Sequence, residues 1–187
     1  MKTEVENASK ILREGGVILY PTDTVWGLGC DPTNPGAIEK IYRIKKRDDR
    51  KSMLVIIDDD FRLASYIDQV PEIAYALIEV SEKPLTIIYP GAKNLSANLV
   101  ADDGSVGIRI TSDLFCKSLV KKFGKPIVST SANQSGEPSP SLFSEVSENI
   151  IHQVDYVVNW RQDDIERAEP SSIIKLDERG HIKIIRK

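Results

Sequence analysis

Short apolar runs that alternate with helical patterns are the feature that most constrains the fold of this chain. One run, Met53-Leu54-Val55-Ile56-Ile57, is apolar at every position, as expected for a strand that is covered on both faces. Similar runs occupy positions 17–20, 85–89, 106–110, 127–130, 156–158, 173–176 and 182–185. Strands that are buried on both faces need helices above and below them, which predicts an α/β fold.

The helical patterns lie mainly in the first part of the chain, where they alternate with the strands. Asn34-Pro35 is typical of a helix start, and apolar residues at helical spacing then lead to Lys45. Further helical patterns occupy positions 5–12, 61–67, 72–80, 114–119 and 141–151. Because strands dominate the last part, we expect a twisted, open sheet of mixed parallel and antiparallel strands with flanking helices. Glu178-Arg179-Gly180 predicts a hairpin turn between the last two strands.

The length and charge of the chain limit the classes of protein to which it can belong. Its 187 residues suffice for one well-packed core, so we expect residues 1–187 to form a single domain. Lys and Arg number 25 against 28 Asp and Glu, and this net charge of -3 excludes a uniformly basic RNA-coating protein. No apolar run approaches the roughly 18 residues of a membrane span, and no targeting segment is evident. We therefore expect a cytoplasmic protein without a membrane partner.

Cysteine and histidine are too few for a structural zinc site or a disulfide framework. Cys30, Cys116, His152 and His181 are scattered along the sequence and include no CxxC pair. We therefore predict no protein-held metal site. The count alone leaves a catalytic Cys–His pair open, although two small buried hydrophobes are the simpler interpretation of the cysteines.

Three polar segments border the predicted strands. Residues 20–31 follow a strand and are rich in hydroxyls and glycines, so their backbone can approach a ligand closely, but they match no dinucleotide or Walker motif. Residues 45–51 place five cations and two anions where a helix meets a strand, a common anion-binding position in α/β proteins. Residues 128–140 carry hydroxyls and an amide into a Gly/Pro-rich loop, which suits a phosphate or a ribose.

Each of these segments also has a simpler interpretation when it is taken alone. Residues 20–31 could be a turn held by local hydrogen bonds, residues 45–51 a solvated charged face, and residues 128–140 an ordinary polar loop. The combination is more informative, because all three segments border buried strands and could converge at one end of the sheet.

The motifs in these segments resemble those of the YrdC-like family, which includes threonylcarbamoyl-AMP synthases and YciO-type paralogues. In order along the chain they are Pro21-Thr22-Asp23-Thr24-Val25-Trp26-Gly27-Leu28-Gly29, Lys45-Lys46-Arg47, Lys83-Pro84-Leu85-Thr86, Val106-Gly107-Ile108-Arg109 and Ser129-Thr130-Ser131-Ala132-Asn133-Gln134-Ser135-Gly136. The resemblance covers nearly the whole chain. It implies a twisted open α/β sheet around a large, positively charged cavity.

The resemblance further implies a nucleotidyl transfer reaction. A synthase of this family condenses L-threonine, bicarbonate and ATP into threonylcarbamoyl-adenylate and releases pyrophosphate. The product supplies the t6A modification of tRNA adenosine 37, so the implied partners include the t6A transfer machinery. We expect any tRNA or double-stranded RNA binding to be weak and salt-sensitive, because the net charge is negative. ATP is then a substrate, and Mg²⁺ is expected with it because both reactants are anionic.

Site residues follow from the resemblance by motif position. It assigns L-threonine to Thr24, Arg109, Thr130 and Ser171, with Arg109 as the partner of the carboxylate. It assigns the nucleotide to Arg47, Lys51, Ser105, Ser131, Asn133, Ser139 and Arg186. Lys45 and Arg47 are the predicted catalytic residues, because their charge would neutralise the phosphates. This chemistry needs no histidine, and the sequence offers no evident general base.

The chain departs from the family pattern at several positions, and other functions stay open. Asp48 replaces the proline that usually follows the motif arginine, Ser52 replaces a glycine or proline, and Trp26 stands where synthases often have tyrosine. Pro21-Thr22-Asp23 is similar to the YciO branch, whereas Thr130-Ser131-Ala132-Asn133 favours the synthase branch. A noncatalytic RNA-binding module is an alternative, although aromatic residues make up only 6% of the chain. A nucleotide-binding protein that acts on another small carboxylate is a further alternative.

Overall fold

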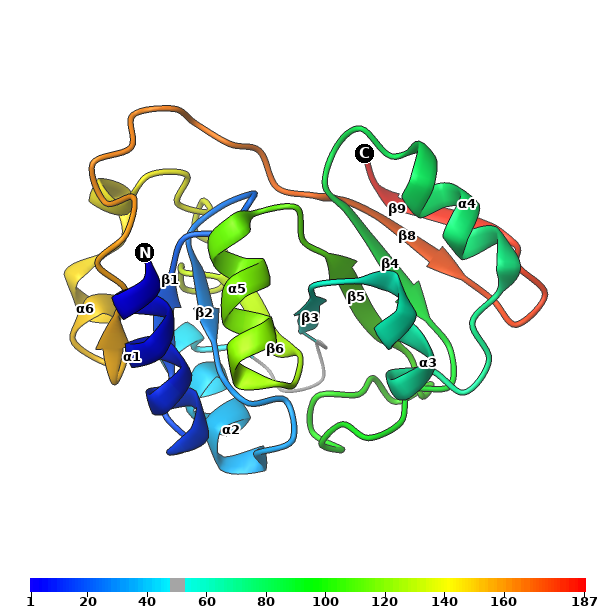
Figure 1. Ribbon diagram of the computed structural model, residues 1–187, viewed down its shortest axis with the longest axis horizontal. Helices are drawn as coiled ribbons and strands as arrows, with labels where there is room; N and C mark the ends of the chain where they lie inside the picture. Colours follow the sequence, from blue (N-terminus) through cyan, green and yellow to red (C-terminus); the bar gives the residue numbers. More distant parts are fainter. Residues whose placement is uncertain (48–52) are drawn as a thin grey trace.

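A computed structural model describes residues 1–47 and 53–187, and within them the chain forms a sheet in the order β7-β1-β2-β6-β3-β5-β4-β8-β9 (Figure 1). The strands are β1 (Ile18–Tyr20), β2 (Gly27–Gly29), β3 (Leu54–Ile57), β4 (Leu85–Tyr89), β5 (Val106–Ile110), β6 (Ile127–Ser131), β7 (Tyr156–Val157), β8 (Ser172–Leu176) and β9 (Ile182–Arg186). The helices are α1 (Lys2–Arg13), α2 (Pro35–Lys45), α3 (Leu63–Tyr66), α4 (Glu72–Val80), α5 (Leu114–Phe123) and α6 (Glu148–Ile151), with 3-10 turns η1 (Asp60–Arg62) and η2 (Phe143–Glu145).

The sheet is mixed, which confirms the predicted fold class. The pairs β1–β7, β3–β5 and β4–β8 are parallel, and the remaining neighbours are antiparallel. Helices α1 and α5 lie side by side over one face of the sheet, while α2 packs on the other (Figure 1). The central strand β3 shows this arrangement, because Ile56 packs with α1 and α5 whereas Val55 and Ile57 pack with α2. No helix in the described ranges is long and apolar enough to cross a membrane.

One long connection joins the two halves of the sheet. The chain leaves β7 at one edge and crosses the molecule, as the orange segment of Figure 1, before it enters β8 beside β4. Its last residues, Pro170 and Ser171, thereby lie over the middle of the sheet, where they line a cavity.

Several local predictions are confirmed. Helix α4 has the predicted bounds, and Asn34 caps α2 by accepting hydrogen bonds from the backbone nitrogens of Gly36 (3.0 Å) and Ala37 (3.1 Å). The predicted hairpin turn joins β8 to β9, with Gly180 at a φ of 80° that favours glycine.

The helix predicted over residues 141–151 is wrong, because the backbone is extended at Val146 and Ser147 and divides this segment into η2 and α6. The carboxylate of Glu145 accepts hydrogen bonds from the backbone nitrogens of Ser141 (2.9 Å) and Leu142 (3.2 Å). These bonds cap the start of η2, and the extended backbone at Val146 and Ser147 then separates η2 from α6. The helix predicted over residues 61–67 is likewise divided, into η1 and α3.

Strand β2 is absent from the predictions, since its sequence Gly27-Leu28-Gly29 has low strand propensity. Packing explains the glycine at position 29. A Cβ atom there would lie 2.7 Å from Cε1 of Tyr20 and 2.9 Å from the carbonyl oxygen of Val128. The strand therefore forms between β1 and β6 only because this position carries no side chain.

Candidate active site

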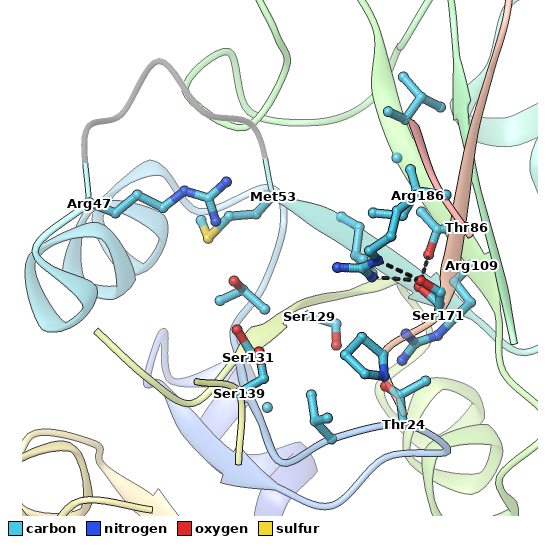
Figure 2. A pocket seen from close by; sticks show the side chains of 18 residues that line it. Thr24, Arg47, Met53, Thr86, Arg109, Ser129, Ser131, Ser139, Ser171 and Arg186 are labelled. Carbon is cyan, nitrogen blue, oxygen red and sulfur yellow. Dashed lines mark hydrogen bonds between the residues drawn. The ribbon is translucent and has the colours of Figure 1, made fainter. Parts of the chain in front are cut away.

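A cavity of about 250 Å³ lies over the middle of the sheet, where the three polar segments of the sequence meet (Figure 2). Its described lining contains three arginines, several hydroxyls and no carboxylate. The lining residues are Thr24, Val25, Gly27, Arg47, Met53, Leu54, Thr86, Ile88, Gly107, Arg109, Ser129, Thr130, Ser131, Ser139, Pro170, Ser171, Ile173 and Arg186. The predicted positive charge of the cavity stays a prediction, because residues 48–52 lie outside the described part of the chain.

The loop between β1 and β2 presents Thr24 to the cavity. The hydroxyl of Thr22 accepts a hydrogen bond from the backbone nitrogen of Thr24 (3.0 Å) and donates one to the carbonyl oxygen of Val25 (2.8 Å). The hydroxyls of Thr22 and Thr24 are also 3.0 Å apart. Because these groups are buried, the loop is held by its own side chains, and the position of Thr24 is set by Thr22.

Arg109 on β5 reaches the cavity as part of a buried ion pair. Its Nη2 lies 3.0 Å from Oδ1 of Asp23, and only 4% of the Arg109 side chain and 8% of the Asp23 side chain are exposed. Asp23 Oδ2 also accepts a long hydrogen bond, 3.4 Å, from the backbone nitrogen of Ser112. Within the described residues, Nε of Arg109 is buried and has no hydrogen-bond acceptor, so the guanidinium is not fully satisfied by the protein.

Ser171 joins two further residues on the same side of the cavity as Arg109, across from Arg47 (Figure 2). Its hydroxyl lies 2.8 Å from the hydroxyl of Thr86 on β4. Its carbonyl oxygen accepts hydrogen bonds from Nε (2.9 Å) and Nη2 (2.6 Å) of Arg186 on β9. Burial and the positive charge of Arg109 lower the pKa of Arg186 from its ordinary value. The two guanidiniums therefore belong to one electrostatic neighbourhood.

The remaining polar groups come from β6 and from the end of α2. Ser129, Thr130 and Ser131 lie on β6, and Ser139 lies in the loop that follows. Arg47, just beyond α2, approaches from the other side of the cavity (Figure 2), and burial lowers its pKa. Hydroxyls thus lie between arginines at two ends of the cavity.

Lys45 does not line this cavity, although it belongs to the basic segment. Its side chain is buried, and its Nζ donates hydrogen bonds to the carbonyl oxygens of Ser131 and Asn133. Burial, together with the charge of Arg47, lowers the pKa of Lys45 to about 8. The lysine therefore fastens the end of α2 to the loop after β6.

Eight predicted site residues come together in the cavity, and others lie elsewhere. The eight are Thr24, Arg47, Arg109, Thr130, Ser131, Ser139, Ser171 and Arg186. Ser105 lines a separate cavity beside the β8–β9 hairpin and donates to Oδ1 of Asp103 (2.6 Å), while the Asn133 side chain donates to the carbonyl oxygens of Gln134 (2.9 Å) and Glu137 (2.6 Å). Lys51 lies outside the described residues. The roles assigned to these residues stay predictions.

The site predictions omitted Thr86, Ser129 and Met53, which also line the cavity. Alternation along β4 could have revealed Thr86, because alternate residues of a strand face the same side and both Thr86 and Ile88 line the cavity. The alternation could not have revealed the Asp23–Arg109 pair, which depends on how the β1–β2 loop packs against β5.

Neither a protein-held metal nor a catalytic cysteine finds support in this arrangement. Within residues 1–47 and 53–187, no group of three His, Cys, Asp or Glu side chains could hold a metal ion, and Asp23 is engaged by Arg109. These residues do not fit a Mg²⁺ site of the protein's own. Cys30 and Cys116 are buried, and burial raises the pKa of both thiols, so neither is activated as a thiolate.

Comparison with known proteins identifies relatives over most of the chain. The Sua5/YciO/YrdC family model, described as "Telomere recombination", matches residues 10–187. The threonylcarbamoyl-AMP synthase of Pseudoalteromonas translucida is 36% identical over 161 residues, which cover 84% of this chain and 86% of the relative. The threonylcarbamoyl-AMP synthase of Halorhodospira halophila is 32% identical over 167 residues, which cover 89% and 87%.

Solved structures show the same fold. E. coli YciO matches with a TM-score of 0.87 and 27% identity over 100% of this chain and 90% of that chain. P. abyssi Sua5 complexed with L-threonine matches with a TM-score of 0.83 and 24% identity over 94% of this chain. This chain spans about half the length of that structure, 52%. From the match over residues 10–187 and the identity to the two bacterial synthases, we conclude that the chain belongs to the Sua5/YciO/YrdC family.

Proposed function

We propose that this protein makes L-threonylcarbamoyl-AMP from L-threonine, bicarbonate and ATP, with release of pyrophosphate. Two relatives that align over most of their length are named threonylcarbamoyl-AMP synthase, which supports a transferase-type enzyme. The observation that carries the proposal is the cavity, where Arg109 and Arg47 stand at different sides of a hydroxyl-rich floor. Such a site suits two anionic substrates that bind side by side and react with each other.

In this proposal, L-threonine binds at the Arg109 end. The carboxylate accepts hydrogen bonds from the guanidinium of Arg109, which offers planar, directed donors. Thr24, Thr130 and Ser171 supply hydroxyls for the remaining polar groups of the amino acid. The P. abyssi Sua5 structure contains L-threonine, which supports a threonine site in this fold.

The nucleotide then occupies the rest of the cavity. Arg47 and Arg186 neutralise the phosphates, and Ser131 and Ser139 donate hydrogen bonds to the nucleotide. Lys45 contributes indirectly, because its two hydrogen bonds hold the backbone of Ser131 in place. Any Mg²⁺ would be held mainly by the ATP phosphates, where it would offset their negative charge.

The chemistry depends mainly on positioning and charge. Bicarbonate takes up a proton and loses water to give carbon dioxide, and the neutral amine of L-threonine captures the carbon dioxide as a carbamate and releases a proton. A carbamate oxygen then attacks the α-phosphorus of ATP. The bond between the α-phosphorus and the pyrophosphate oxygen breaks, and pyrophosphate leaves. The arginines that line the cavity stabilise the charge that develops on the phosphate oxygens. The described lining holds no histidine or carboxylate, so we assign removal of the amine proton to substrate or water.

The downstream role is proposed on the same basis. The product would supply the t6A modification of tRNA, and transfer to tRNA would require partner proteins. A noncatalytic RNA-binding module has less support, because the described cavity lining includes no aromatic side chain on which a base could stack.

The identity of the product tests the proposal. We expect the protein, incubated with L-threonine, ATP, Mg²⁺ and carbon-13 bicarbonate, to form an adenylate that carries the carbon-13 label, as read by mass spectrometry. An adenylate without the label would indicate a different acyl donor. If no adenylate forms, the proposed reaction is wrong.

A further inference from the structure

We propose that Asp23 sorts the two anionic substrates in the cavity, by offsetting much of the charge of Arg109 while leaving some of its hydrogen-bond donors unpaired. The inference rests on the proposed function, since it assumes that a carboxylate and a polyphosphate share one site. Asp23 itself does not belong to the described lining of the substrate cavity.

Asp23 approaches Arg109 from behind the substrate cavity. It lies beside a second cavity, of about 240 Å³, on the other side of β5, where its neighbours include Ile108 and Ile110. The two side chains are almost fully buried, and their charged atoms are 3.0 Å apart. Water screens such a pair poorly, so Asp23 offsets much of the Arg109 charge that is felt from the cavity, although Arg109 still lowers the pKa of Arg186.

This pair leaves the donors of Arg109 only partly used. The contact between Nη2 and Oδ1 lacks the alignment of a hydrogen bond, and Nε has no acceptor within the described residues. Arg109 therefore recognises a ligand through directed N–H groups more than through net charge. A planar monoanion such as a carboxylate is the ligand that fits this combination.

Arg186 provides the contrast within the same cavity. It bonds to the neutral carbonyl oxygen of Ser171, and within the described residues no carboxylate forms an ion pair with it. It therefore keeps its full charge towards the cavity. Because the attraction of an ion grows with the product of the charges, Arg186 favours a polyphosphate over a carboxylate more strongly than the partly neutralised Arg109 does.

Without Asp23, Arg109 and Arg186 would both face the cavity without a carboxylate that offsets their charge. Arg109 would then present a full positive charge, which attracts a triply charged phosphate chain about three times as strongly as a monoanion at the same distance. The polyphosphate would compete with L-threonine for Arg109. Specificity of this kind arises from weakening the wrong ligand rather than from strengthening the right one.

A second buried pair supplies a matched control. Asp58 Oδ1 lies 2.7 Å from Nε of Arg62, and the Asp58 side chain is only 1% exposed. Neither residue lines the substrate cavity. Substitution of either aspartate should weaken an ion pair and lower stability, whereas only the Asp23 substitution should change which anions bind.

The experiment measures L-threonine and tripolyphosphate binding by calorimetry, each alone and in the presence of the other. In the wild-type protein, we expect each ligand to leave the dissociation constant of the other within about threefold. In Asp23→Asn, we expect tripolyphosphate to bind about tenfold more tightly and to compete with L-threonine. Asp58→Asn should behave as the wild type. Unchanged tripolyphosphate affinity in a folded Asp23→Asn variant would overturn the inference.

Asp23→Asn leaves a buried arginine unpaired, so this variant could fail to fold. The double variant Asp23→Asn/Arg109→Gln removes both charges and keeps the net charge of the pair. We expect it to bind tripolyphosphate within about threefold of the wild type and to lose L-threonine binding. If tripolyphosphate binding weakens as much as L-threonine binding, Arg109 is part of the polyphosphate site and the inference is wrong. A wild-type protein that binds no L-threonine would instead reject the proposed function, while the tripolyphosphate measurements would still report on Asp23.

Discussion

Nζ of Lys45, at the end of α2, donates a hydrogen bond of 2.7 Å to the carbonyl oxygen of Asn133, in the loop after β6. The backbone nitrogen of Ser135 in turn donates to the carbonyl oxygen of Lys45, at 2.9 Å. These bonds join the basic segment to the hydroxyl-rich loop, so two segments far apart in the sequence form one wall of the site.

The buried position of Lys45 predicts an unusual pH dependence of stability. Its folded pKa is about 8, lowered mainly by burial, against an ordinary value of 10.5. Between these two pH values the unfolded state binds more protons than the folded state, so the contribution of Lys45 to the free energy of unfolding rises with pH. From pH 7 to 9.5, the wild type should gain about 2 kcal/mol of unfolding free energy relative to Lys45→Met in urea denaturation. Lys46 is exposed, so the wild type should show no such gain in unfolding free energy relative to Lys46→Met. An equal pH dependence in all three proteins would show that Lys45 keeps its ordinary pKa.

Arg47→Ala should weaken ATP binding by about 1.5–3 kcal/mol, the range for a charge-assisted hydrogen bond. Arg47 lines the cavity just beyond α2, whereas Arg43 lies within α2 and is exposed. Arg43→Ala is therefore the matched control, and calorimetry should give it the wild-type ATP affinity. If both variants bind ATP as the wild type does, the basic segment is only a solvated surface.

The sequence predicts some residues of this wall but not the contacts that hold it together. Apolar patterning is sufficient to locate β3, where Val55, Ile56 and Ile57 are buried, and motif position leads to Arg47 and Ser131. The bond of Lys45 to two backbone carbonyls was not predictable, because it depends on the path of a loop and not on side-chain pattern. Strand β2 was missed for a related reason, since tertiary packing and not propensity makes its glycines a strand.

The hydroxyl pair of Thr86 and Ser171 should contribute to L-threonine binding. Thr86→Val removes the hydroxyl that lies 2.8 Å from the Ser171 hydroxyl and leaves that buried group without this partner. We expect the L-threonine dissociation constant to rise by a factor that corresponds to about 0.5–1.5 kcal/mol, with little change for ATP. The double variant with Ser171→Ala should be less than additive, because both changes remove one interaction. Fully additive effects in calorimetry would show that the two hydroxyls act independently.

Gly29→Ala should destabilise the fold by about 1–3 kcal/mol, the usual cost of overpacking. The added methyl would lie 2.7 Å from the ring of Tyr20 and 2.9 Å from the backbone of Val128, which cannot easily move. Gly36→Ala, in α2, meets only the side chain of Asn34 at 3.5 Å and should leave stability unchanged or slightly raised. Chemical denaturation distinguishes the two, and equal stability of both variants would contradict the tight packing of β2.

Pyrophosphate release with one substrate omitted at a time tests the central claim most directly. With Mg²⁺ present, we expect release to require ATP, L-threonine and bicarbonate together, and other amino acids to replace L-threonine poorly. The reason is that the attacking group is a carbamate, which forms only from the amine and carbon dioxide. Pyrophosphate release that is equally fast without L-threonine, or no release with all substrates present, would contradict the account.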